Sequence, residues 1–194
     1  MTKRYDQLVG IILDRAPHVL VEVGVHNALR AQLMCEAARK RSGKIRYMGY
    51  DVFETETYGF HERALNGKGI PSQRAAETRM VALARKLGGI HWGFIVGDTA
   101  RTLHGYTVTC DFAFIDGDHR VEMIRGDALA LDCPCLVFDD YYTPGPEGRV
   151  ADITKYGANA VVAELEAAGR GITVLPKKDL TKEGCFASLV MVTK

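Results

Sequence analysis

The segment from Cys110 to Tyr142 constrains the fold of this 194-residue chain more than any other. It contains two short, largely apolar runs at 111–115 and 136–138, and a pair of acids follows each run. Between the runs, residues 121–131 show the spacing of an amphipathic helix. A strand, a crossover helix and a second strand make the two strands parallel, so both acidic turns should lie at the same edge of one sheet.

The acids that follow these runs form a group of four carboxylates: Asp116, Asp118, Asp139 and Asp140. If the two strands are direct neighbours, about 5 Å apart, the carboxylates converge on one place. Like charges at that separation repel, so a cation, a proton or several N–H donors must compensate them. The pattern therefore predicts a ligand site. Two plainer interpretations stay open: Asp118 as a helix cap, and Asp139-Asp140 as a solvated strand end.

The rest of the chain alternates between strand-like and helix-like patterns. Apolar runs predict further strands at 19–25, 45–51, 90–96, 172–175 and 186–192, and the last two have only loop between them. This order predicts an α/β fold with a doubly wound, mostly parallel sheet and an antiparallel edge, built as one domain over residues 1–194. Segments 52–70 and 141–150 have no such period, and we interpret both as lids.

Composition narrows the function classes. The chain is 47% hydrophobic, enough for a full core, and its formal net charge of +1 argues against nucleic acid or a membrane surface as partner. The sequence shows no signal peptide and no apolar run approaching the roughly 20 residues of a membrane span. Five cysteines without regular spacing favour a reducing, cytoplasmic location. A homo-oligomer is compatible with these features.

The other predicted strand ends indicate a nucleoside ligand. Gly24 follows the first strand, Asp51 ends the second, and Asp98 follows the third. Ligands of such sheets bind beyond the carboxyl ends of the strands, and an acid after the second strand suits ribose hydroxyls. A dinucleotide should be accompanied by G-x-G-x-x-G, but only Gly24 of that pattern is present. A ribose-containing cofactor without a pyrophosphate fits best.

These motifs resemble those of class I S-adenosylmethionine-dependent methyltransferases, in particular the small O-methyltransferase-like subgroup with an I-D-G-D-H motif and a later D-D. The resemblance runs from about Val19 to Leu165. It implies a Rossmann-like, seven-stranded sheet whose last strand inserts antiparallel. The motifs that carry it are Glu22-Val-Gly-Val25, Tyr50-Asp51, Gly97-Asp98, Phe114-Ile-Asp-Gly-Asp-His119 and Val137-Phe-Asp-Asp-Tyr141.

The resemblance also implies how the cofactor is held. Asp51 would bind the ribose hydroxyls, and Glu22 and Gly24 would border the methionine portion. Asp98 and Thr99 would lie by the adenine, and Asp116 would lie between cofactor and metal. This chain departs from the usual glycine-rich first loop, because His26 and Asn27 crowd it, although asparagine tolerates a left-handed conformation.

In metal-dependent members, the residues matching Asp116, Asp139 and Asp140 bind Mg²⁺, and the residue matching Asp118 serves as base. A hard divalent cation takes oxygen ligands and lowers the pKa of a bound hydroxyl. Asp118 or His119 would then accept the proton.

We therefore expect methyl transfer from S-adenosylmethionine to a small-molecule hydroxyl, assisted by Mg²⁺. Segments 52–70 and 141–150 would select the acceptor. Two alternatives remain open. A nicotinamide-dependent oxidoreductase is opposed by the missing G-x-G-x-x-G, and a non-catalytic cofactor-binding protein of the same fold would bind the cofactor without turnover.

Overall fold

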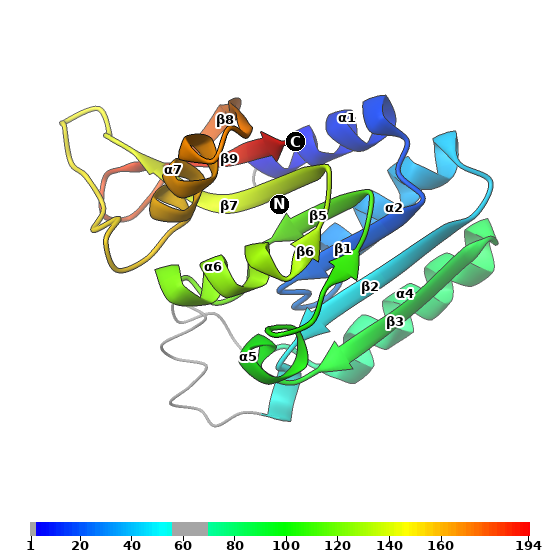
Figure 1. Cartoon of the computed structure of the whole chain (residues 1–194). Helices are drawn as coiled ribbons and strands as arrows, with labels where there is room; N and C mark the ends of the chain where they lie inside the picture. Colours follow the sequence, from blue (N-terminus) through cyan, green and yellow to red (C-terminus); the bar gives the residue numbers. More distant parts are fainter. Residues whose placement is uncertain (1–2, 56–69) are drawn as a thin grey trace.

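The computed structural model describes residues 3–55 and 70–194, and a seven-stranded sheet forms its centre (Figure 1). The strand order is β3-β2-β1-β5-β7-β9-β8, and all neighbouring pairs are parallel except those that β9 makes with β7 and β8. This confirms the predicted doubly wound sheet and its antiparallel strand. The strands are β1 (Val19–Val23), β2 (Ile45–Asp51), β3 (Ile90–Val96), β5 (Phe112–Ile115), β7 (Cys135–Thr143), β8 (Gly171–Leu180) and β9 (Phe186–Thr193).

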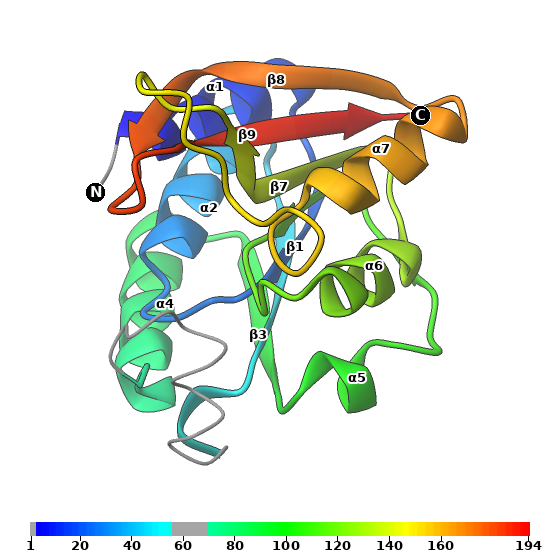
Figure 2. The same ribbon diagram turned by 90° about the vertical axis from the view of Figure 1, so that its left-hand side faces the viewer.

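Helices cover both faces of the sheet (Figure 2). On one face lie α1 (Asp6–Arg15), which follows the 3-10 turn η1 (Lys3–Tyr5), α2 (Leu29–Arg41) and α4 (Gln73–Leu87). On the other lie α5 (Thr99–Thr102), α6 (Val121–Leu129) and α7 (Asn159–Ala167). A short turn, η2 (Phe53–Thr55), follows β2, and β4 (Val108–Thr109) pairs with β6 (Leu131–Asp132) in a separate two-stranded sheet. Within the described residues, every helix is too short or too polar to cross a membrane.

The strand pattern explains why the sheet is buried on both faces. Successive side chains of a strand point to opposite faces, so a continuous apolar run supplies two cores. In β5, Phe112 and Phe114 pack with α1 and α2, whereas Ala113 and Ile115 pack with α6 and α7. Strands β5 and β7 are direct parallel neighbours, which is the condition for the acids near their carboxyl ends to lie close together.

The end of β7 differs from the prediction. Asp139 and Asp140 lie within the strand at a bulge between Phe138 and Tyr141, and Asp140 has a φ of 51°. The strand continues because β9 supplies hydrogen-bonding partners as far as Thr143. Residues 141–143 of the predicted second lid are therefore strand, and the loop is 144–150. Most of the first predicted lid, residues 56–69, lies outside the described residues.

Candidate functional site

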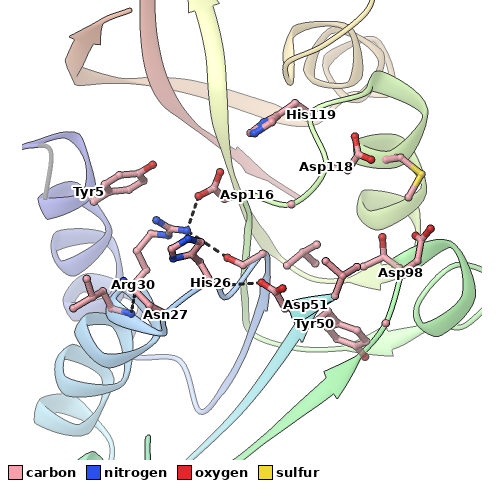
Figure 3. Close-up of a pocket in the computed structure, with 18 of the residues that line it drawn as sticks. Tyr5, His26, Asn27, Arg30, Tyr50, Asp51, Asp98, Asp116, Asp118 and His119 are labelled. Carbon is pink, nitrogen blue, oxygen red and sulfur yellow. Dashed lines mark hydrogen bonds and ion pairs between the residues drawn. The ribbon is translucent and has the colours of Figure 1, made fainter. Parts of the chain in front are cut away.

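The carboxyl ends of β1, β2, β3 and β5 open on one cavity of about 410 Å³ (Figure 3). Strand-end residues predicted from the sequence make up much of its wall: Gly24, Asp51, Asp98, Thr99, Asp116, Asp118 and His119. Glu22, Asp139 and Asp140 lie outside the wall that the described residues form. The structure thus brings most of the predicted residues together. Glu22 and Asp139 are buried, whereas Asp140 is partly exposed and contacts His119.

The loop after β1 has positive φ angles, which glycine adopts most readily, at non-glycine residues as well as at Gly24. Gly24 has a φ of 88°, and a Cβ there would lie 1.9 Å from the carbonyl oxygen of Asp116. His26 and Ala28 also have positive φ, at 52° and 58°. The left-handed residues are therefore His26 and Ala28 rather than Asn27, and each non-glycine residue adds conformational strain. This conformation keeps the turns after β1 and β5 in close contact.

Asp51 ties this loop to the end of β2. Its Oδ2 accepts the backbone N–H of His26 at 2.8 Å, and its Oδ1 accepts that of Phe53 at 2.7 Å. Burial raises the pKa of Asp51, and these N–H bonds oppose the rise. Each carboxylate oxygen has a second lone pair, so the group can accept further hydrogen bonds from a ligand in the cavity. Asp98 similarly caps α5 by accepting the N–H of Ala100 at 2.9 Å.

Glu22 lies beneath the cavity. It is fully buried, accepts a hydrogen bond from the Tyr47 hydroxyl and lies 3.6 Å from Arg30 Nε. Burial raises its pKa to about 8, although Arg30 and Tyr47 oppose the rise. Arg30 lines the cavity, with Nη2 2.8 Å from Asp116 Oδ2 and 3.4 Å from the Gly24 carbonyl oxygen. Glu22 therefore acts on the site through Arg30.

The acids of β7 are held by the N-terminal segment. Asp139 Oδ2 accepts the Tyr5 hydroxyl at 2.5 Å and Arg4 Nη2 at 3.0 Å, and the same nitrogen lies 3.4 Å from Asp140 Oδ1. Burial raises the pKa of Asp139 to about 8, and Asp116 and Asp140 add to the rise while Arg4 and Tyr5 oppose it. Asp139 Oδ2 therefore already has two donors, Arg4 and Tyr5.

These contacts test the predicted Mg²⁺ site. Among the described residues, Asp116, His119 and Asp140 each offer a ligand atom within 4.8 Å of the others. However, Asp116 is paired with Arg30, and Asp140 with Arg4 and with His119 Nδ1 at 2.9 Å. Mg²⁺ prefers oxygen ligands and keeps several bound waters. The guanidinium groups of Arg4 and Arg30 lie beside these acids and disfavour a second cation there. The donor set as arranged does not fit Mg²⁺.

The two predicted bases have different surroundings. The Asp118 carboxylate accepts the backbone N–H of Arg120 at 2.9 Å and pairs with its guanidinium at 2.6 Å. The N-cap of α6 is Arg120, so the interpretation of Asp118 as the helix cap is wrong. His119 lines the cavity, and Asp140 binds its Nδ1. A carboxylate on Nδ1 orients an imidazole and sets its tautomer. Of the two predicted bases, His119 is the one with a side chain oriented by an acid of β7.

Sequence reasoning missed Arg4, Tyr5 and Arg30. Arg30 had a signal: it lies in the first turn of α2, a fully described helix whose first turn has no acid, where a cation opposes the helix dipole. Such a cation needs acidic partners nearby. Arg4 and Tyr5 had no local signal, because they reach the site only through the packing of η1 against β8 and β9.

No protein-family model and no curated protein matches this chain. Solved structures do. An O-methyltransferase from Bacillus cereus in complex with SAH aligns with 100% of this chain and 82% of its own, at a TM-score of 0.61 and 16% identity. The O-methyltransferase TomG from Streptomyces achromogenes, involved in tomaymycin synthesis and in complex with SAM, aligns with 98% of this chain and 79% of its own, at 0.57 and 15%.

A third neighbour is a precorrin-6y C5,15-methyltransferase from Geobacter metallireducens, which aligns with 97% of this chain and 89% of its own, at a TM-score of 0.53 and 12% identity. The fold therefore occurs among enzymes with different methyl acceptors, and by itself it does not identify an acceptor. The chain has the Rossmann-like fold of class I S-adenosylmethionine-dependent methyltransferases.

Proposed function

We propose that this protein transfers the methyl group of S-adenosylmethionine to a hydroxyl group of a small molecule. The observation that carries the proposal is the convergence of Asp51, Asp98 and Asp116, from the ends of β2, β3 and β5, on one cavity. Such convergence at the carboxyl edge of a doubly wound sheet is typical of a ligand site. The solved neighbours with SAM or SAH bound support this choice of cofactor.

In this proposal the cofactor lies along the strand ends. The Asp51 carboxylate accepts a hydrogen bond from each of the two ribose hydroxyls. It uses the lone pairs that remain after its oxygens have accepted the backbone N–H groups of His26 and Phe53. Asp98 and Thr99 border the adenine, and Gly24 lets the backbone approach the methionine portion, because it has no side chain in the way. S-adenosylmethionine supplies an electrophilic methyl group on a sulfonium.

The chain's own residues then place the acceptor and take its proton. His119 would accept the hydroxyl proton as the acceptor oxygen takes the methyl group from the sulfonium, which would leave as S-adenosylhomocysteine. Asp140 holds the imidazole in position at 2.9 Å. In-line placement supplies most of the rate of such a transfer. The proposal gives Mg²⁺ no role, because Asp116 and Asp140 are paired with Arg30 and Arg4 and this donor set does not fit Mg²⁺.

Methyl transfer should be tested with labelled S-adenosylmethionine and a panel of phenols, alcohols and cell-extract metabolites. We expect the label in a methyl ether formed from a hydroxyl-bearing acceptor. The His119→Ala variant should lose about 10²–10⁴-fold in kcat while its affinity for S-adenosylhomocysteine stays unchanged. Asp14→Asn, which changes an exposed acid on α1, is the matched control. Cofactor binding without transfer to any acceptor would favour the non-catalytic alternative instead.

The remaining expectations belong to the proposal as well. The cavity size suits a cofactor with a small acceptor rather than a macromolecule. The absence of nucleic acid and membrane partners, the cytoplasmic location and a homo-oligomeric state stay predictions from composition.

A further inference from the structure

Arg4 occupies the place between the two β7 acids where a cation would bind. Its Nη2 lies 3.0 Å from Asp139 Oδ2 and 3.4 Å from Asp140 Oδ1, and its Nε lies 3.3 Å from Asp179 Oδ2 on β8. The Arg4 side chain is 11% exposed and that of Asp139 is 2% exposed. Water screens such buried pairs weakly, so the guanidinium is a strong and fixed counter-charge.

Arg30 makes the corresponding contact on the β5 side. Its Nη2 lies 2.8 Å from Asp116 Oδ2, and its side chain is 16% exposed. The Tyr5 ring lies beside both arginines, with each guanidinium carbon 5.0 Å from the ring centroid. Tyr5 also accepts a hydrogen bond from Arg4 and donates one to Asp139. The three side chains form one unit, the Arg4–Tyr5–Arg30 cluster, against the acids.

We propose that the Arg4–Tyr5–Arg30 cluster replaces a divalent cation in this protein, so that Asp116, Asp139 and Asp140 bind no metal. A metal ion close enough to ligate Asp140 and Asp116 would also lie beside two guanidinium groups, and like charges repel. The cluster already forms an ion pair with each acid of the trio. Arg4 is then a positioning residue, which holds Asp140 and, through it, the His119 ring. The proposal concerns cation binding and is independent of methyl transfer.

Removing one guanidinium should uncover a cation site. In Arg4→Met the acids Asp139, Asp140 and Asp179 keep their positions on β7 and β8 but lose their shared partner. Carboxylates that close need a new counter-charge, and a divalent cation provides it. Arg4→Lys keeps the positive charge and should stay metal-free.

The test is Mn²⁺ binding to the full-length protein, read from the loss of the free-ion paramagnetic resonance signal, with Mg²⁺ competition. We expect no saturable binding to the wild type or to Arg4→Lys up to about 1 mM Mn²⁺, and at least about tenfold tighter binding to Arg4→Met. Adding Asp140→Asn to Arg4→Met should remove the gained site. Arg125→Met, which breaks an exposed pair with Glu164, is the matched control and should behave as the wild type.

Saturable wild-type binding that Asp140→Asn abolishes would overturn the proposal, and this arm needs no arginine variant to fold. Failure of a folded Arg4→Met to gain binding would also overturn it, because another feature would then exclude the cation. S-adenosylhomocysteine titrations on the same samples report on the proposed function separately.

Discussion

The most quantitative prediction concerns Glu22, the fully buried carboxyl beneath the cavity. We consider Glu22→Gln, which mimics the neutral form of the side chain in shape and keeps an acceptor for the Tyr47 hydroxyl. Burial raises the pKa of Glu22 from its ordinary 4.5 to about 8. The folded protein therefore holds this proton over a pH range in which the unfolded chain has released it.

The size of the effect follows from this difference. Below pH 4.5 both states are protonated, and above pH 8 both are ionised. Between those values the unfolded chain ionises first, so the stability of the wild type falls as the pH rises. A difference of roughly 3.5 pKa units corresponds to about 5 kcal/mol at 1.36 kcal/mol per unit. Glu22→Gln lacks this loss, so its stability relative to the wild type should increase by up to about 5 kcal/mol from pH 4.5 to 8.

The assay is urea unfolding of both proteins at several pH values over this range. The difference between their unfolding free energies cancels the titration of all other groups that do not contact Glu22. Glu166→Gln, at an exposed position on α7, is the matched control and should follow the wild type. A difference between Glu22→Gln and wild type that stays constant within about 1 kcal/mol across the range would refute the reasoning.

Two further predictions test the first loop. Gly24→Ala should lower the free energy of unfolding by more than about 2 kcal/mol, because the added Cβ meets a backbone oxygen at 1.9 Å and the φ is 88°. Thermal unfolding measures this loss of stability. The control is Gly43→Ala, where no described atom lies within 4 Å of the new Cβ. Equal melting temperatures for the two variants would contradict the prediction. His26→Val should be about 1–2 kcal/mol less stable than His26→Gly, because a β-branched residue tolerates a positive φ poorly. Equal urea midpoints for the two variants would show that the left-handed conformation is not required.

The sheet could be predicted from the sequence because its signals are local. Largely apolar runs mark β1, β2 and β3, and each is closed or followed by a glycine or an acid that lines the cavity. The crossover between β5 and β7 makes these strands parallel whatever the side chains do later. The position of Asp51 and Asp116 at one edge follows from this topology, and the structure confirms that both line the cavity.

The partners of the acids could not be predicted in the same way. Arg4 lies 135 residues from Asp139 in sequence, and nothing in the periodicity of the first helix indicates where η1 packs. The bulge that keeps Asp139 and Asp140 within β7 depends on pairing with β9, which is also remote in sequence. Local patterns therefore located the charges, whereas tertiary packing decided what neutralises them.

The central claim is that the strand-end acids form one cofactor cavity, and calorimetric titration with S-adenosylhomocysteine tests it most directly. We predict saturable binding to the wild type and to Asp14→Asn. Binding to Asp51→Asn should be about 10–100-fold weaker, as expected when a carboxylate loses charge-assisted hydrogen bonds to hydroxyls. The absence of heat from the wild type at high micromolar ligand, or equal affinity in Asp51→Asn, would contradict the account.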